Sequence, residues 1–495
     1  MSQQRPSTLG ALRESTYRPR TVHEEMRANL IVRLKEKSNP FPGVIGFERT
    51  VLPQMYNAIL SRHDFILLGL RGQAKTRLLR ALEGLLDEFV PAVLDSPLNE
   101  DPFVPLTSET RRRIETEGDA LPIRWIPRAD RYREKLATPD VTVSDLIGDI
   151  DPIKAATQKL SLDDPRVIHY GIIPRTNRGI FAINELPDLQ SRIQVGLLNI
   201  LEEGDIQIRG FPVRLPLDLV MVFSANPEDY TNRGNIITPL RDRISSQILT
   251  HYPRTLEDAL AITRQEAWSE RDGEVAVHLP SFVEELIEET AFQGRQSEHV
   301  DQNSGISARM TISLRENVIS NAERRALSLG EPSTTARLSD VFSALAAITG
   351  KVELVYEGEQ EGPQKVALVL IGRAVQVMFD RQVPKDERPQ AGTEETPSAF
   401  QPILTWFGSG KHVDLADDLS DAELQQRLGA IPALADMAQR YLAPAPAALP
   451  DNELPAAMEF LLEALHQHSF LSRGELVHGH VYRDVFEEMA RSLNS

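Results

Sequence analysis

The chain has 495 residues, 41% of them hydrophobic, so it is long enough for roughly two to four domains with sizeable cores. It contains no cysteine, which excludes disulfide scaffolds, thiolate metal sites and cysteine nucleophiles. The net charge of −18 argues against a protein that coats nucleic acid. No apolar run approaches the ~20 residues of a membrane span, and no N-terminal stretch resembles a signal peptide, so we expect a cytoplasmic protein without a membrane partner.

The N-terminal segment differs in charge from the rest of the chain, because basic residues outnumber acidic ones in the first 37 positions. We expect residues 1–38 to form a partly disordered arm with a solvated helix at about residues 23–37. A contact with nucleic acid is the less favoured alternative. Residues 47–61 then show apolar residues near helical spacing, and Pro53 marks either a kink or the helix start.

The most informative stretch is GLRGQAKT, at residues 69–76. It follows the apolar run 65–68, which predicts a strand, and precedes residues 77–89, which predict a helix. A glycine-bearing turn between a strand and a helix directs backbone N–H groups at an anion. Lys75 is then placed to reach the β- and γ-phosphates of a nucleotide, and the Thr76 hydroxyl to bind Mg²⁺. The alternative is an ordinary strand-to-helix turn with a solvated lysine.

Position 74 departs from the usual pattern G-x-x-x-x-G-K-[ST], because alanine stands where the second glycine belongs. A methyl group there narrows the space for a phosphate. It is tolerated provided that the backbone at residue 74 does not need a positive φ. Taken alone, this degenerate motif supports nucleotide binding and an ordinary turn about equally. The choice between them depends on the other motifs of the chain.

Further apolar runs predict how the chain is organised. Strands are expected at 123–127, 179–185 and 219–225, an irregular insertion at 91–122, a helix at 187–203 and a hairpin at 205–217. Strands that alternate with helices predict a parallel α/β sheet. Residues 256–347 have a helical pattern, whereas 351–377 are consistent with either a strand pair or a helix. Residues 385–402 read as a linker, and the tail after 402 is helical in periodicity.

Polar residues follow two of these strands. An ATPase needs an oxygen ligand beside Mg²⁺, a residue that positions water and a polar probe of the γ-phosphate. Glu185 can orient the attacking water. Asn184 stands in the place of the usual aspartate and can accept a hydrogen bond from a magnesium-bound water, but it adds no charge. Asn226 follows the next strand and can position water through its amide. The alternatives are a polar strand end with a helix cap, and a simple Asn-Pro turn.

Arginines in two later segments can neutralise transition-state charge. Arg241 and Arg243 flank Asp242, and an arginine here can be supplied to the nucleotide of a neighbouring subunit, which requires an oligomer. The alternative is an exposed ion pair of little energetic weight. Arg309 opens a predicted helix at 311–329 and can reach back to the γ-phosphate from a separate lid. The alternative for this residue is a solvated arginine beside a helix cap.

Together these segments resemble the AAA+ ATPases of the MoxR and magnesium-chelatase group. Five motifs in the family's order carry the resemblance, namely GLRGQAKT (69–76), GIFAINEL (179–186), VFSANPEDY (222–230), ITPLRDRI (237–244) and SGISARM (304–310). The runs at 145–155 and 169–204 are similar to the chelatase ATPase subunit, and the hairpin at 204–218 to an insertion of this branch. The resemblance covers roughly residues 39–350.

The resemblance implies an α/β fold, in which a P-loop parallel sheet is sandwiched by helices and followed by an α-helical lid and a small helical C-terminal region. We therefore expect four parts after the N-terminal arm. They are a nucleotide-binding domain at 39–255, a lid at 256–380, a linker at 381–402 and a C-terminal helical module at 403–495.

The resemblance also assigns roles to residues by their place in the family motifs. The implied ATP-binding residues are Gly69, Gly72, Gln73, Ala74, Lys75, Thr76 and Arg77. The implied Mg²⁺ ligands are Thr76 and Asn184. The implied catalytic residues are Glu185 of Walker B, Asn226 as sensor 1, Arg243 as arginine finger and Arg309 as sensor 2.

The resemblance implies a homo-oligomeric ring, usually a hexamer, that couples Mg-ATP hydrolysis to remodelling a partner protein or inserting a metal or cofactor into it. Partners in this group often carry a von Willebrand A domain, and this chain has no D-x-S-x-S run of its own. Two alternatives remain. One is a nucleotide-binding scaffold with weak or no hydrolysis, which Ala74 and Asn184 motivate, and the other is the ATPase subunit of a magnesium chelatase.

Overall fold

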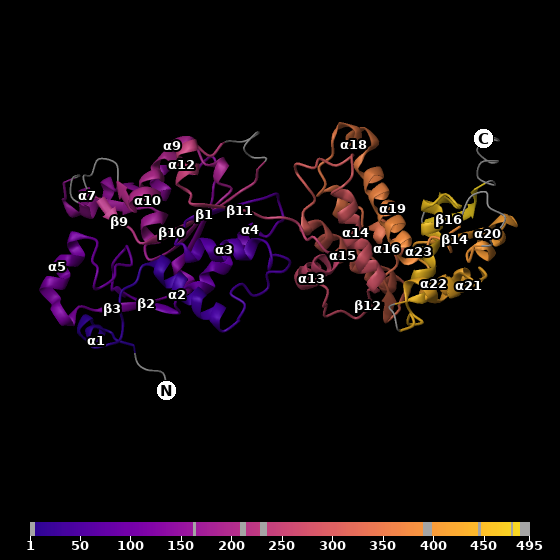
Figure 1. Ribbon diagram of the computed structural model, residues 1–495, viewed down its shortest axis with the longest axis horizontal. Helices are drawn as coiled ribbons and strands as arrows, with labels where there is room; N and C mark the ends of the chain where they lie inside the picture. Colours follow the sequence, from indigo (N-terminus) through magenta and orange to yellow (C-terminus); the bar gives the residue numbers. More distant parts are fainter. Residues whose placement is uncertain are drawn as a thin grey trace. The chain divides into compact units, whose positions relative to one another are not determined.

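The computed structural model of the chain describes residues 5–161, 165–207, 214–227, 235–389, 398–443, 447–476 and 479–485. The chain divides into two compact units, Met1–His251 and Tyr252–Ser495. Figure 1 shows the elements of both units in sequence colours. Each unit is described by itself below.

The first unit is built on a five-stranded parallel sheet in the order β11-β1-β10-β7-β4. The strands are β1 (Phe65–Leu68), β4 (Tyr132–Leu136), β7 (Gly179–Asn184), β10 (Leu219–Ala225) and β11 (Ser246–Leu249). The three inner strands β1, β10 and β7 are almost continuous apolar runs, as expected of strands buried on both faces. The predicted parallel α/β sheet is therefore confirmed.

Alternate residues of the inner strands face two separate hydrophobic cores. One core contains Phe65, Ala182 and Val222, and it is covered by α2 (Val22–Lys35), α3 (Val51–Leu60) and α4 (Lys75–Ala81). The other contains Ile66, Phe181 and Phe223, and it is covered by α9 (Ser191–Gly196), α10 (Leu198–Glu203) and α12 (Thr238–Arg243). Figure 1 shows these two sets of helices on opposite sides of β1 and β10.

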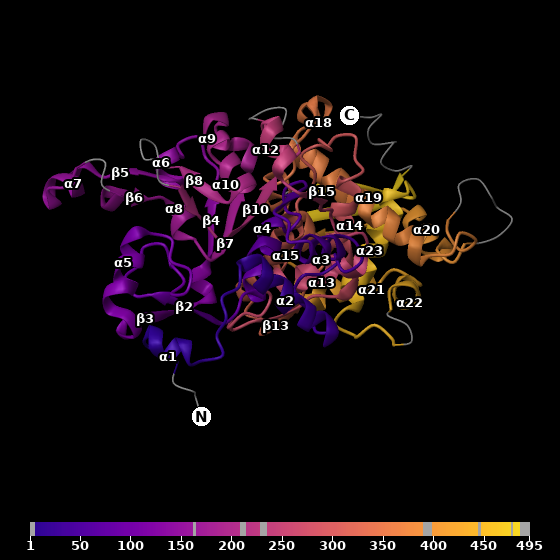
Figure 2. The same cartoon turned by 60° about the vertical axis from the view of Figure 1, so that its left-hand side comes forward.

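Smaller elements complete the first unit. The antiparallel pair β2 (Phe89–Val93) and β3 (Ile123–Pro127) is grouped with α1 (Leu9–Arg13) and α5 (Ser108–Glu117), as Figure 2 shows. Leu9 packs there against Val93 and Leu121. The remaining elements are α6 (Val143–Leu146), α7 (Pro152–Gln158), α8 (Ile172–Arg175), and the antiparallel pairs β5 (Gly148–Ile150) with β6 (Ile168–Tyr170) and β8 (Asp205–Gln207) with β9 (Arg214–Pro216).

The first unit differs from expectation in several places. The helix predicted at 77–89 ends earlier, because α4 passes into a short 3-10 turn at Leu82–Leu85 and then into β2. The helix predicted at 187–203 is divided into α9 and α10 at Leu197. Strand β4 was not predicted, because its sequence YREKL carries charges, as an edge strand can. The tip of the predicted hairpin, 208–213, lies outside the described residues.

The helix expected at about residues 23–37 is present as α2, but the expectation that it is solvated and that the arm is partly disordered is wrong for residues 5–38. Leu9, Leu12 and Leu30 of α1 and α2 are fully buried. Glu25 of α2 is 3% exposed and accepts hydrogen bonds of 2.7 and 2.6 Å from the Arg131 guanidinium. The segment is therefore part of the first unit, and its charged side chains have partners that are distant in the sequence.

The second unit is mainly helical. Its first helices are α13 (Leu256–Glu266), α14 (Ser281–Gly294), α15 (Ala308–Leu329), α16 (Leu338–Ser343), α17 (Ala346–Thr349), α18 (Tyr356–Glu361) and α19 (Pro363–Gln382). The undecided segment 351–377 is thus helical where it has regular structure. Four more helices follow, α20 (Gln401–Gly408), α21 (Asp421–Gly429), α22 (Leu434–Leu442) and α23 (Leu454–Gln467). One hydrophobic core, with members from Phe282 to Tyr482, joins the earlier helices of this unit, such as α14, α15 and α19, to the later helices α20–α23.

The second unit also contains strands that the sequence did not predict. β12 (Ala276–His278) pairs in parallel with β13 (Ser333–Thr335). In the C-terminal region, β14 (Val413–Ala416), β15 (Leu471–Leu476) and β16 (Gly479–Asp484) form an antiparallel sheet in the order β14-β16-β15. The C-terminal region is therefore helical with an added small sheet. Among the described residues, no helix combines the length and the apolar character needed to cross a membrane.

A buried carboxyl group lies between the first helices of the second unit. Glu288 of α14 is 3% exposed, and its neighbours are Thr263 of α13, Thr311 of α15, Arg295 and Arg315. The two threonine hydroxyls are 3.0 Å apart and hydrogen-bonded to each other. Burial raises the pKa of Glu288 to about 7, and the threonines and arginines oppose this rise.

We expect Glu25→Ala to lower the free energy of unfolding by about 3–5 kcal/mol, because it leaves the buried Arg131 guanidinium without its carboxylate. Urea denaturation of the full chain measures the change. The matched control is Glu36→Ala at the exposed end of α2, for which we expect a change within about 0.5 kcal/mol. Equal effects of the two substitutions would contradict the structural role of the pair.

We expect the stability of the second unit to fall as the pH rises from about 4.5 to about 7. The folded unit retains the Glu288 proton up to about pH 7, whereas the unfolded chain releases it near the ordinary value of 4.5. The difference corresponds to at most about 3 kcal/mol. Glu288→Gln should remove the part of this dependence that Glu288 contributes and stabilise the unit at pH 8, as measured by urea denaturation across that pH range. The buried Glu459, whose pKa is also raised to about 7, should keep its own contribution in this variant. The exposed control Glu257→Gln should keep the full dependence.

Candidate functional site

Three neighbouring parallel strands end at the same edge of the sheet. Their registers pair Leu68 with Ala225 and Phe223 with Ile183, so the carboxyl ends of β1, β10 and β7 lie side by side. The loop at residues 69–74 follows β1, Asn226 follows β10, and Asn184 ends β7. Ligands of open α/β sheets bind outside the carboxyl ends of the strands. The structure therefore brings together the predicted phosphate loop, Asn184, Glu185 and Asn226.

The loop before α4 contains two residues with a left-handed backbone. Gly72 has a φ of 74° and Ala74 a φ of 55°. The condition under which alanine is tolerated at position 74, a backbone without positive φ, is therefore not met. The left-handed conformation costs an alanine roughly 1 kcal/mol. The loop thus has the backbone conformation that glycine normally adopts at position 74, and Ala74 is strained in it.

The glycine at position 69 is required by close packing. Its N–H donates to the carbonyl of Ala225 at 3.2 Å. A Cβ atom on Gly69 would lie 1.9 Å from Thr250 Oγ1 and 2.2 Å from Gln73 Oε1. The Thr250 hydroxyl donates to that Gln73 oxygen at 2.7 Å. The hydrogen bond of Gln73 therefore links the loop to Thr250, the residue after β11. The sequence did not indicate a role for Thr250.

Lys75 is buried within the loop, with 7% of its surface exposed. Its ammonium group donates to the carbonyl oxygens of Gly69 and, at 3.0 Å, of Leu70. This arrangement excludes the alternative of a solvated lysine. Thr76, the next residue of α4, is half-buried, whereas Arg77 is exposed. A cation enclosed by the loop is what recognition of a phosphate chain requires.

Ser224 links the residues at the end of β7, although the sequence analysis did not single it out. Its hydroxyl donates to Asn184 Oδ1 at 3.1 Å and accepts from the N–H of Glu185 at 3.3 Å. Ser224 and Asn226 are both 1% exposed. Glu185 has a φ of 55°, which turns the chain away from the strand direction. The only signal in the sequence was the position of Ser224 two residues before Asn226.

The two predicted arginines belong to different units. Arg243 ends α12, and its Nε donates to Glu202 Oε2 at 2.7 Å, while its Nη1 donates to the Pro239 carbonyl at 3.1 Å. Glu202, of α10, was not anticipated as its partner. Arg309 lies in the second unit at the start of α15, where it is exposed and its backbone N–H donates to Ser307 Oγ at 3.1 Å.

The polar groups at the sheet edge suit a magnesium ion that arrives with a nucleotide. Within the described ranges, no cluster of three or more His, Asp or Glu side chains is placed to hold a metal ion. Mg²⁺ bound with phosphates does not need one, because phosphates and waters supply most of its oxygen ligands. The Thr76 hydroxyl and Asn184 Oδ1 are uncharged oxygens of the required kind. The enclosed ammonium of Lys75 and these oxygens therefore fit Mg-ATP.

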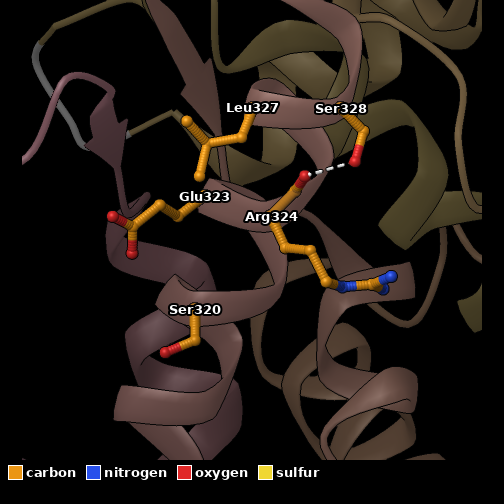
Figure 3. Close-up of a pocket in the computed structure, with 5 residues that line it drawn as sticks. All are labelled: Ser320, Glu323, Arg324, Leu327 and Ser328. Carbon is orange, nitrogen blue, oxygen red and sulfur yellow. Dashed lines mark hydrogen bonds between the residues drawn. The ribbon is translucent and has the colours of Figure 1, made fainter.

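Two hollows elsewhere contain none of these residues. One, of about 350 Å³, lies along α15 and is lined by Ser320, Glu323, Arg324, Leu327 and Ser328. Figure 3 shows the Ser328 hydroxyl bonded to the Arg324 carbonyl, at 2.9 Å, so this hydroxyl is satisfied within the helix. The other, of about 590 Å³, is in the first unit and includes Arg113, Lys154, Arg166 and Arg175. Neither hollow is lined by residues of the phosphate loop.

A buried lysine at the start of α4, enclosed by the loop that follows β1, and polar side chains at the ends of the adjoining strands define a P-loop nucleotide-binding fold. No protein-family model matches the chain. Curated relatives do match it. The magnesium-chelatase subunit ChlI of Nostoc sp. is 27% identical over 325 residues, which are 61% of this chain and 80% of the relative. The ChlI subunit of Anabaena variabilis is 28% identical over 298 residues, or 56% and 81% of the two chains.

The magnesium-chelatase 38 kDa subunit of Cereibacter sphaeroides is 28% identical over 243 residues, covering 47% of this chain and 65% of the relative. Over these lengths the chain is similar in sequence to magnesium-chelatase subunits. A solved structure of a complex between the magnesium-chelatase subunits BchI and BchD aligns with 20% identity, over 65% of this chain and 98% of that one. The TM-score of this alignment is 0.34, so it supports no conclusion about the chain.

We expect Ala74→Gly to raise the free energy of unfolding by roughly 0.5–1 kcal/mol, because glycine removes the cost of the left-handed backbone. Urea denaturation measures this change. The matched control is Ala81→Gly, at a right-handed residue of the same helix with a φ of −65°, which should lower stability by roughly the same amount. A loss of stability in both variants would show that position 74 does not need glycine.

Proposed function

We propose that this chain is a ring-forming ATPase that couples Mg-ATP binding and hydrolysis to the remodelling of a partner protein, or to the insertion of a metal or cofactor into it. The observation that carries the proposal is the convergence of the phosphate loop, Asn184, Glu185 and Asn226 at one edge of the sheet. The relation to magnesium-chelatase subunits supports it. We place this activity in the cytoplasm.

In the proposed site, the enclosed Lys75 ammonium would exchange the carbonyls of Gly69 and Leu70 for the β- and γ-phosphates. Thr76 and Asn184 would hold the Mg²⁺, which when bound neutralises phosphate charge. Glu185 would orient the attacking water. Asn226, buried after β10, would contact the γ-phosphate and the same water.

The arginines are the reason to propose a ring, with six subunits as the usual number in this group. Arg243 would reach the nucleotide of the adjoining subunit, and Arg309 the γ-phosphate of its own subunit. Arg243 is paired with Glu202, whose side chain is 56% exposed. Pairs at such exposure contribute about 0–1 kcal/mol, so exchanging the carboxylate for a phosphate costs little. Glu202 would thus hold the arginine until a neighbour is present.

Two other functions have specific support. The strained Ala74 and the uncharged Asn184 favour a nucleotide-binding scaffold with slow or no hydrolysis. The match to 80% of the length of a ChlI subunit favours the ATPase subunit of a magnesium chelatase. The partner differs between the candidates. A remodeller of this group would act with a protein that carries a von Willebrand A domain, and a chelatase ATPase with another chelatase subunit.

We expect the purified chain to bind and hydrolyse ATP in millimolar Mg²⁺. Lys75→Ala should abolish binding, because it removes the cation that the loop encloses. Glu185→Gln should bind ATP normally but hydrolyse it at least about 100-fold more slowly, because it loses the base. Calorimetry measures binding, and phosphate release measures turnover. The matched controls, Lys35→Ala and Glu88→Gln, alter exposed residues and should behave as the wild type.

The results of these experiments distinguish the three candidate functions. No heat with ATP in the wild type would contradict every nucleotide-based function. Binding without turnover, in the presence of candidate partners as well, would favour the scaffold. Affinity purification of Glu185→Gln with ATP then tests the partner. Recovery of a protein with a von Willebrand A domain supports the remodeller, and recovery of chelatase subunits supports the chelatase.

A further inference from the structure

Arg309 lies at the start of α15, and the segment that leads into this helix is contacted by Arg295, at the end of α14. We propose that Arg295 is a positioning residue for Arg309. Its guanidinium joins that segment to Tyr252, the first residue of the second unit. This inference rests on the proposed contact of Arg309 with the γ-phosphate.

Arg295 has two kinds of contact within the second unit. Its Nε donates to the Ile306 carbonyl at 3.2 Å. Its Cζ lies 4.5 Å from the centroid of the Tyr252 ring, as in a cation–π contact, and 5.4 Å from that of the Phe292 ring. A planar guanidinium can stack on an aromatic ring and donate a hydrogen bond at the same time. Arg295 therefore links Tyr252 to Ile306, two residues that are far apart in the chain.

The position of Ile306 determines where the first turn of α15 lies. Ile306 is fully buried and packs on α14, since a Cβ atom on Gly294 would lie 2.1 Å from Ile306 Cδ1. The next residue, Ser307, is the N-cap of α15, and its Oγ accepts from the Arg309 N–H at 3.1 Å. Met310 is fully buried as well. The backbone of Arg309 is thus fixed on both sides, while its side chain is exposed.

Tyr252 connects this arrangement to the phosphate loop through the chain itself. The two residues before it are held within the first unit. The Thr250 hydroxyl donates to Gln73 Oε1 at 2.7 Å, and His251 Nε2 is hydrogen-bonded at 2.7 Å to the hydroxyl at the N-cap of α3. Tyr252 follows directly and stacks against Arg295. Each of these three consecutive residues is therefore anchored, and the side chain that anchors the last one also holds the start of α15.

The surroundings of Arg295 separate positioning from support of the fold. Arg295 Nη1 is buried and has no hydrogen-bond partner among the residues that the structure describes. A buried polar nitrogen without a partner opposes folding, because the loss of its hydration is not offset. The neighbouring Glu288 does not require the charge of Arg295, because burial already raises the pKa of Glu288 to about 7 and it can stay protonated. We therefore expect an apolar side chain of similar length, as in Arg295→Met, to be tolerated by the fold.

The test measures the affinities of the full chain for ATP and for ADP by calorimetry in Mg²⁺, in the Glu185→Gln background so that ATP is not consumed. Only ATP carries the γ-phosphate, so Arg309→Ala should lower the ratio of the two affinities on the order of tenfold, as loss of a hydrogen bond to a charged group does. Arg295→Met should lower the ratio by a similar factor. The two substitutions together should lower it no further than Arg309→Ala alone. Arg324→Met, at an exposed arginine of α15, is the matched control and should leave the ratio unchanged.

Support of the fold alone would weaken the binding of both nucleotides equally, so an unchanged ratio in Arg295→Met would overturn the proposal. A double variant whose ratio falls by the product of the two single effects would overturn it too. If Arg295→Met does not fold, Arg295→Lys takes its place, because an ammonium keeps the charge but not the planar stack. A ratio equal to that of the parent protein in Arg295→Lys would overturn the proposal.

Failure of the proposed function gives a different result. A parent protein that binds neither nucleotide would refute nucleotide binding as a whole, and an unchanged ratio in Arg309→Ala would refute the proposed role of Arg309. In both cases this inference fails with the function on which it rests. A lowered ratio in Arg309→Ala with an unchanged ratio in the Arg295 variants would refute the inference alone.

Discussion

The parallel pairing of β1, β10 and β7 is the constraint on which the candidate site depends. Both faces of these strands are buried, so polar groups are left only at their ends. The registers bring the ends of the three strands to one edge, and the phosphate loop, Asn226 and Asn184 meet there. Some of the buried polar groups at this edge are hydrogen-bonded to one another, as Ser224 is to Asn184 and Glu185.

The two departures from the family pattern have different physical consequences. Ala74 is a local problem of backbone conformation, since the residue adopts the left-handed geometry of glycine and the loop still encloses Lys75. Asn184 is an electrostatic problem, since it keeps an oxygen but loses a charge. The loop tolerates the backbone strain at Ala74 without help from other residues. An uncharged amide at this position leaves the end of β7 with less negative charge than the family pattern supplies.

Strands with two buried faces were predictable, and strands at edges were not. β1, β7 and β10 are apolar runs that only a covered parallel sheet explains. The charged sequence of β4 and the short strands β14, β15 and β16 have no such pattern. The N-terminal segment was misjudged for a related reason. Its charges suggested solvent, but Glu25 is paired with Arg131, more than a hundred positions away.

The sequence by itself determined the order of the motifs, the α/β class and the residues available for phosphate and magnesium, because these depend on local pattern and spacing. Only the tertiary structure decided which partners those residues take. Examples are Lys75 on the loop carbonyls, Gln73 on Thr250, Arg243 on Glu202 and Asn184 on Ser224. Such contacts follow from strand order and register, which join residues far apart in the chain and leave no periodic signal in it.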